Sequence, residues 1–170
     1  SIALLFLLVG RKGLAHPFQT CVRGIQGSLI PVVFISIVVG YGTAVQATPV
    51  FGWLVEQVLS LDMNPYLLTF VAVNLLAGMT ANGTGGVTLF MENFGATILG
   101  NPAINVGALH RIAAISGAGF DSLPHNGAIA FQLSVFKLSY KDGYFQQFMM
   151  SVLVNLLAGL LAVLMAVVLF

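Results

Sequence analysis

Residues 115–129 read ISGAGFDSLPHNGAI and interrupt an otherwise apolar part of the chain. The apolar segment on each side is too short to cross a bilayer alone. In lipid every backbone N–H and C=O needs a partner, so a polar break at membrane depth must be buried in protein or line a wet cavity. Broken helices of this kind bind ions and substrates in secondary transporters. The stretch therefore predicts half of a transporter's binding site.

The composition predicts an all-α integral membrane protein. Hydrophobic residues make up 58% of the chain and charged residues 6%, against about 45–50% and about 25% in soluble domains. The net charge of +1 argues against a nucleic-acid partner. Cys21 is the single cysteine, so no internal disulfide can form and no metal cluster is indicated. We expect no cofactor other than a coupling ion, with membrane lipid as the surroundings.

Residues 1–46 are expected to hold the end of a helix, an interfacial connector and a scaffold transmembrane helix. The apolar run 2–9 is too short to span, and its basic residues follow rather than precede it, unlike a signal peptide. We expect the chain to start inside a helix of a longer protein whose N-terminal half is missing. Residues 13–26 are mixed in polarity and predict the connector, whereas 28–46 are long enough to span.

Residues 47–62 predict an amphipathic connector lying in the interface, with Trp53 at headgroup level. A half-length apolar helix follows, then the polar tip 80–86, then a second short helix. Two short limbs around such a tip are typical of a re-entrant hairpin, which we place at 65–98.

The polar break at 115–129 divides a broken helix that we place at 102–138. With the hairpin it forms the expected transport-domain part, residues 63–140. Residues 141–170 are predicted to be a C-terminal transmembrane helix, on which Asn155 and Gly159 share one face and serve helix packing.

Charge placement predicts the topology. Basic residues fall in two loops, and the positive-inside rule makes those loops cytoplasmic. The loop that carries Glu56 and Asp62 has no Lys or Arg and is expected outside. The hairpin then enters from outside and the C-terminus ends outside. The basic residues of these two loops are Arg11, Lys12, Arg23, Lys137 and Lys141, and the sixth, Arg111, lies inside the first half of the broken helix.

We expect the hairpin tip and the break to meet near the bilayer midplane. Helix N-termini there would favour an anion, and C-terminal carbonyls would favour a cation. The expected substrate ligands are Asn82, Thr84, Ser122, His125 and Asn126. The expected coupling-ion ligands are Thr80, Ser116 and Asp121. Asp121 is the best candidate for coupling, although it could instead cap the following half-helix, and His125 could simply bond backbone locally.

Other hypotheses compete with this site. The two polar stretches could be ordinary turns at the membrane surface. Arg111 could attract an anionic substrate or pair structurally with Glu92, and we favour the pair. A hydrolytic triad is disfavoured, because Asp121, Ser122 and His125 sit on one short turn. A passive channel is disfavoured, because no ring of repeated pore-lining residues is present.

At residues 109–129 the sequence resembles the gluconate permease family of the ion transporter superfamily. Members carry a similar His-Arg…Ser-Gly-Gly-x-Asp-x-Leu-Pro-His-Asn-Gly-Ala run, from which Ala118 and Phe120 depart. Residues 74–86 are similar to the family's hairpin tip. The resemblance covers 13–170 and corresponds to the C-terminal half of such a protein.

The resemblance implies one inverted-repeat half of an elevator-type transporter, active as a homodimer in a bacterial inner membrane. It implies import of a small hydroxy-carboxylate or sugar acid, such as gluconate or 3-hydroxybutyrate, with protons as the usual coupling ion. Two alternatives stay open: a sodium-coupled carboxylate symporter, and a membrane scaffold subunit that transports nothing. The protein is expected not to be an enzyme.

Overall fold

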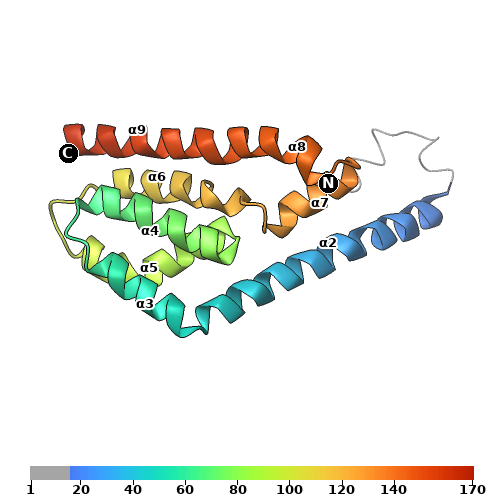
Figure 1. The fold of residues 1–170 in the computed structure, drawn as a ribbon, viewed down its shortest axis with the longest axis horizontal. Helices are drawn as coiled ribbons and strands as arrows, with labels where there is room; N and C mark the ends of the chain where they lie inside the picture. The colour runs from blue at the N-terminus through green and yellow to red at the C-terminus, as the bar shows by residue number, and fades with distance from the viewer. Residues whose placement is uncertain (1–15) are drawn as a thin grey trace. The chain divides into compact units, whose positions relative to one another are not determined.

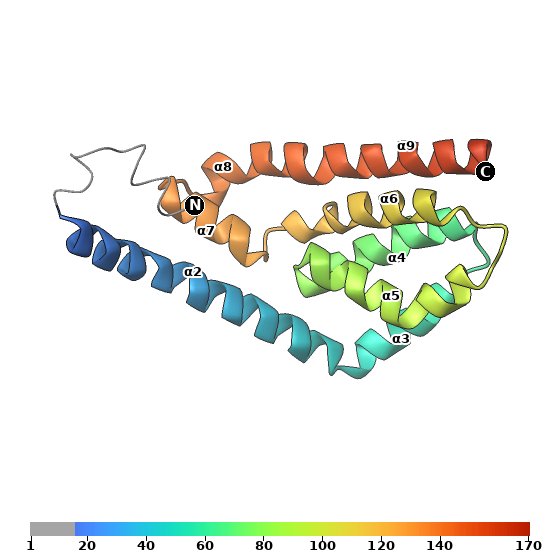
Figure 2. The ribbon, with the colours of Figure 1, turned by 180° about the vertical axis from the view of Figure 1, so that it is seen from behind.

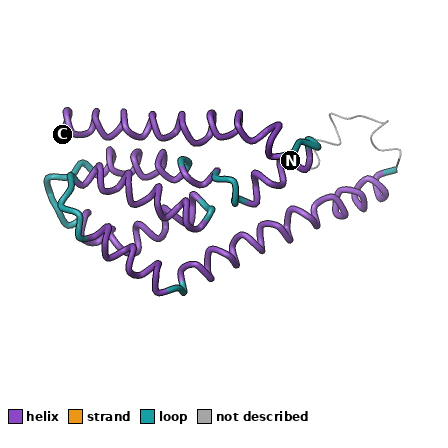
Figure 3. The backbone as a smooth tube through the Cα atoms, viewed as in Figure 1, coloured by secondary structure: helices purple, strands orange, loops and turns teal. Residues whose placement is uncertain are grey.

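The computed structural model describes residues 16–170, and the elements of this range are helical (Figures 1 and 3). The helix expected to end within residues 2–9 lies outside the described part. The chain divides into two compact units, one up to Phe34 and one from Ile35 to Phe170. The helices are α2 Pro17–Gln46, α3 Pro49–Leu59, α4 Pro65–Thr80, α5 Gly83–Leu99, α6 Val106–Gly117, η1 Phe120–Ser122, α7 Gly127–Val135, α8 Tyr140–Gln147, η2 Phe148–Leu153 and α9 Val154–Leu169.

Helix α2 begins earlier in the sequence than expected. It begins at Pro17, where a proline suits the first helical turn because its missing N–H has no intrahelical partner there. Residues 17–26, expected in an interfacial connector, are therefore helical and continue into the predicted span 28–46. Residues of α2 up to Phe34 belong to the first unit, and those from Ile35 belong to the second.

Helix α3 has the amphipathic character that the sequence predicts. Thr48 caps its N-terminus by accepting a hydrogen bond from the backbone N–H of Phe51. Phe51, Val55 and Val58 are buried, whereas Trp53 is 58% exposed. One face therefore packs on the protein, and Trp53 lies on the opposite, open face.

Helices α4 and α5 form an antiparallel hairpin (Figure 1). Helix α4 has 16 residues, and at 1.5 Å per residue it is about 24 Å long, short of a ~30 Å hydrocarbon core. The expectation that residues 80–86 are all non-helical is wrong, because α5 begins at Gly83. Asn82 accepts a hydrogen bond from the backbone N–H of Gly85 and so supports a helical first turn there.

The hydrophobic core of the second unit surrounds α4. Helix α4 packs against α5, α6 and α9, as Figures 1 and 2 show from opposite sides. The side chains of Leu76, Phe90 and Ile112 are almost fully buried here. Phe90 stacks on Phe94 with ring centroids 5.3 Å apart. This packing fixes the two limbs of the hairpin against the broken helix.

The broken helix consists of α6 and α7, separated by a short 3₁₀ turn, η1. Helix α6 begins after Asn105, later than the expected residue 102, because the Asn105 side chain accepts a hydrogen bond from the backbone N–H of Ala108. Helix α7 has nine residues and follows Asn126, its cap. Two short helices, Val106–Gly117 and Gly127–Val135, thus flank the break, within the predicted range 102–138.

Helices α8, η2 and α9 run on as one helix, Tyr140–Leu169, with π-helical geometry in the middle. Within the described part of the chain, these 30 residues form a helix long and apolar enough to cross a membrane. Asn155 donates a hydrogen bond to the carbonyl of Ala118 at 3.2 Å. A Cβ on Gly159 would lie 2.5 Å from Cε2 of Phe70. The predicted packing role of Asn155 and Gly159 is confirmed.

The open end of the hairpin, the start of α6 and the end of α9 lie at the same end of the second unit (Figures 1 and 2). The predicted topology places the hairpin's open end and the C-terminus on the same side of the membrane, and this arrangement is compatible with that. Which side faces the cytoplasm stays a prediction.

Candidate functional site

The hairpin tip is a tight two-residue turn between α4 and α5. Ala81 has φ 51°, in the left-handed region, and Asn82 is the cap of α5. Thr80 is buried, and its hydroxyl donates to the carbonyl of Leu76 at 2.8 Å and lies 3.2 Å from that of Asn82. Thr84 in the first turn of α5 is exposed. The tip therefore offers one inward and one outward hydroxyl.

The break holds its own shape through short-range hydrogen bonds. Ser122 donates to Oδ1 of Asp121 at 2.7 Å. Asn126 accepts hydrogen bonds from the backbone N–H groups of Ala128, at 2.6 Å, and Ile129, at 3.4 Å. Asn126, not Asp121, therefore caps α7, and the carboxylate of Asp121 is left available for another role.

The tip and the break are in contact, as the sequence predicts. The buried amide of Asn126 donates to the carbonyl of Ala81 at 2.9 Å and also to that of Asp121. A Cβ built on Gly83 would lie 2.3 Å from the carbonyl oxygen of Gly117 and 3.1 Å from Oδ2 of Asp121. Gly83 is required for this approach, since any side chain would separate the two backbones.

Four helix ends converge at this contact. Helices α4 and α6 end here, at Thr80 and Gly117, and helices α5 and α7 begin here, at Gly83 and Gly127. Helix N-termini carry partial positive charge and C-termini partial negative charge. The arrangement can hold a carboxylate and a cation close together.

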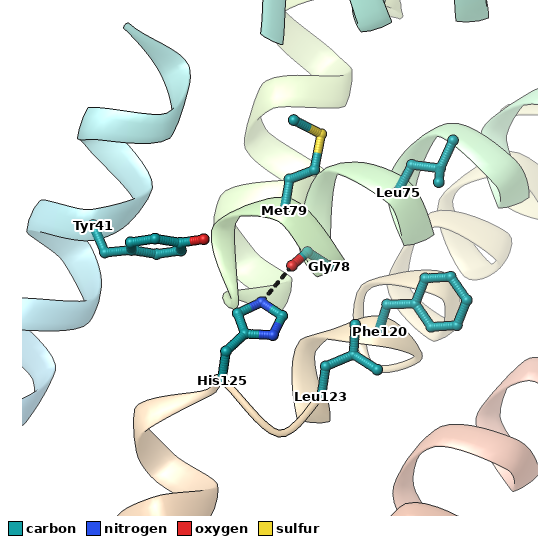
Figure 4. Close-up of a pocket in the computed structure, with 7 residues that line it drawn as sticks. All are labelled: Tyr41, Leu75, Gly78, Met79, Phe120, Leu123 and His125. Atoms are coloured by element: carbon teal, nitrogen blue, oxygen red, sulfur yellow. Dashed lines mark hydrogen bonds between the residues drawn. The ribbon is translucent and has the colours of Figure 1, made fainter. Parts of the chain in front are cut away.

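His125 joins the break to α4 on another side of the tip. Its Nε2 lies 2.8 Å from the carbonyl oxygen of Gly78 (Figure 4). The ring of Tyr41 from α2 meets the imidazole edge-on, with ring centroids 6.3 Å apart. His125 thus bonds a backbone carbonyl, but one 47 positions away rather than a local one.

The predicted coupling-ion ligands are not brought into one cluster by hydrogen bonds. Ser116 is fully buried, and its hydroxyl donates to the carbonyl of Ile112 at 2.7 Å. Thr80 bonds backbone in the same way. Asp121 is bonded by Ser122 instead. Each hydroxyl oxygen keeps lone pairs with which it could still ligate an ion.

Asn74 also belongs to this region, although the sequence pattern predicted only that it lies in the hairpin. It is 3% exposed, and its amide donates to the carbonyl of Phe70 at 2.9 Å. Its Oδ1 is buried with no hydrogen-bond partner among the described residues, and a Cβ on Gly119 would lie 2.0 Å from it. An amide in the middle of an apolar half-helix was the available signal. Tyr41 carried no such signal, because only the fold brings it to His125.

The predicted ion pair between Glu92 and Arg111 is wrong. Both side chains are exposed in the described structure. Arg111 instead lines a groove between α6 and α9.

No protein-family model and no solved structure match this chain. The chain is similar to the uncharacterized transporter YxjC of Bacillus subtilis (strain 168), with 28% identity over 125 residues. That alignment covers 72% of this chain and 26% of YxjC, so the chain spans about a quarter of its relative's length. The class of protein to which the chain is similar is thus a membrane transporter, in agreement with the composition and the long apolar helix.

Proposed function

We propose that this chain forms half of the substrate site of a secondary active transporter that imports a small hydroxy-carboxylate or sugar acid by proton symport. The observation that carries the proposal is the contact between hairpin tip and break, where Asn126 bonds the carbonyl of Ala81. A structural turn at a membrane surface would not bury such an amide between two interrupted helices. The similarity to YxjC supports transport. The acid substrate is proposed from the sequence resemblance of residues 109–129 to gluconate permeases.

At the converging helix ends, the substrate and the coupling ion would bind to different groups. The starts of α5 and α7, with Thr84 and Ser122, would receive the carboxylate and hydroxyls of the acid. Asn82 and Asn126 hold the two starts in place through their caps. Asp121 faces Gly83 across the contact and would carry the coupling proton. Transport would follow an elevator mechanism, with residues 28–46 in the scaffold and residues 63–140 in the moving part of a homodimer.

Uptake by membrane vesicles that carry the full-length protein tests the proposal. Labelled gluconate and 3-hydroxybutyrate are offered, with Asp121→Asn beside the wild type. We expect saturable uptake that falls at least tenfold in the variant at equal protein amount, because the amide cannot release or take up the proton. Asp142→Asn is the matched control, since Asp142 is exposed and bonds only Ser139 locally. Uptake unchanged by Asp121→Asn would remove Asp121 from the mechanism.

The coupling ion is tested by varying pH and sodium independently. Proton symport predicts uptake that rises with external acidity and ignores sodium. Uptake abolished without sodium at every pH would replace the proposal by the sodium-coupled symporter, with Thr80, Ser116 and Asp121 as ligands.

The scaffold-subunit alternative makes a different prediction. In that case Asp121→Asn and Asn126→Ala would alter folding or assembly together, with no selective loss of uptake. Size-exclusion profiles of both variants beside their uptake rates separate the two possibilities.

A further inference from the structure

A hollow of about 370 Å³ opens beside the tip–break contact, between α2, α4 and the break (Figure 4). Its volume is at the lower end of the range of about 300–1,000 Å³ found for small-molecule pockets. Four of its side chains are apolar, and two, Tyr41 and His125, carry polar groups. The lining residues are Tyr41, Leu75, Gly78, Met79, Phe120, Leu123 and His125.

The hydrogen bond to Gly78 fixes the tautomer of His125. A carbonyl oxygen only accepts, so Nε2 of His125 carries a hydrogen and donates it. Nδ1 has no protein partner among the described residues, and the same holds for the hydroxyl of Tyr41. The hollow therefore combines an apolar wall with two polar groups that are free for a ligand.

We propose that this hollow binds the hydrocarbon body of a monocarboxylate and selects such acids over polyhydroxylated ones. The inference rests on the proposed function and narrows its substrate class. Leu75, Met79 and Leu123 would cover an alkyl body and remove it from water. The hydroxyls of a sugar acid would lose their water there without gaining enough partners, which costs free energy.

The carboxylate would stay at the starts of α5 and α7, beside the hollow. With Nε2 donating to Gly78, Nδ1 of His125 is an acceptor and would take a hydrogen bond from one hydroxyl of a short hydroxy acid. Tyr41 on α2 can donate a further hydrogen bond. The other ionisable side chains at the break are Asp121, Tyr140, whose hydroxyl donates to the carbonyl of Pro124, and Tyr144, whose hydroxyl donates to that of Ser122.

The test measures inhibition of uptake by butyrate in vesicles that carry the full-length protein. Butyrate has an unsubstituted alkyl body, and gluconate has a hydroxyl on each carbon beyond the carboxylate. We expect butyrate to compete at a concentration at least tenfold lower than gluconate. Butyramide, which lacks the charge, should compete at least tenfold less well than butyrate, because it has no carboxylate for the starts of α5 and α7 to bind.

Met79→Gln places an amide of similar size in the apolar wall. It should weaken butyrate competition about tenfold and leave gluconate competition unchanged or stronger. Met91→Gln is the matched control, because Met91 is 41% exposed on α5 and does not line the hollow.

The outcomes separate this inference from the proposed function. Uptake of gluconate or 3-hydroxybutyrate without competition by butyrate would overturn the inference and leave the transporter standing. Equal effects of Met79→Gln and Met91→Gln would also overturn it. If Met79→Gln fails to accumulate in the membrane, the butyrate–butyramide comparison on the wild type decides. No uptake of any carboxylate would refute the proposed function, and the inference with it.

Discussion

Asn74 and Gly119 determine how closely the break packs on the hairpin. Oδ1 of Asn74 points at the Cα of Gly119, where the hydrogen of a glycine fits and a methyl group does not. A Cα–H···O contact is a weak but real partner for a buried carbonyl. This contact accounts for an oxygen that otherwise has none among the described residues.

Replacing Gly119 by alanine should therefore destabilise the protein. The new methyl group would lie 2.0 Å from Oδ1 of Asn74, so helix and break must separate, at a cost of about 1–3 kcal/mol for such overpacking. Thermal unfolding in detergent measures the effect as a lower Tm. Gly52→Ala is the control, because a Cβ at Gly52 meets nothing within 4 Å. An unchanged Tm for Gly119→Ala would show that the break is looser than described.

At the scale of the element, polar caps explain why the helices stop in the middle of an apolar chain. Asn64, Asn82, Asn105 and Asn126 each accept a backbone N–H at the start of a helix. Such caps are worth about 1 kcal/mol each. Asn126 differs from the others because its amide also bonds the hairpin tip.

Asn126→Ala should consequently cost more stability than the removal of a simple cap. The carbonyl of Ala81 loses its long-range donor, and an unsatisfied buried group costs about 1–3 kcal/mol beyond the cap itself. Limited proteolysis should then cut the tip or the break sooner than in the wild type. Asn105→Ala removes only a cap and should change cleavage little. Equal cleavage in both variants would mean that the bridge to Ala81 adds nothing.

At the scale of the whole molecule, the hairpin's open end and the end of α9 lie together (Figure 1). The tip and the break lie away from that end, where the half-length helices stop. In a membrane this arrangement would bring both polar interruptions toward the interior, as transporter sites require.

The predicted topology can be measured with single cysteines introduced after Cys21→Ser. Asp62→Cys should react with a membrane-impermeant maleimide from outside intact cells, because its loop lacks basic residues. Lys141→Cys should react only after the cells are opened. The reverse pattern would invert the orientation, with the C-terminus inside.

Substrate protection offers a second measurement at this scale. Thr84→Cys, exposed at the tip, should react more slowly with a maleimide when a transported acid is bound. The exposed position Thr97→Cys, at the far end of α5, should react at the same rate with and without the acid. Equal rates at Thr84→Cys would place the substrate away from the tip.

The sequence by itself determined the membrane class, the half-length helices and the two polar interruptions. These features follow from composition and from local rules, since apolar run length, glycine, and asparagine caps act over a few residues. It also placed Asn126 and Asp121 in the same break. It misjudged the start of α5, because the cap by Asn82 makes glycine-rich residues helical.

Only the tertiary structure decided which residues meet. The bond from Asn126 to Ala81, the pairing of Tyr41 with His125 and the contact of Gly119 with Asn74 join positions 45 or more residues apart. The tertiary structure also leaves Glu92 and Arg111 exposed, without the predicted ion pair between them. Such contacts depend on the helix faces that pack and on the depth at which each helix ends, and no local pattern in the chain encodes either one.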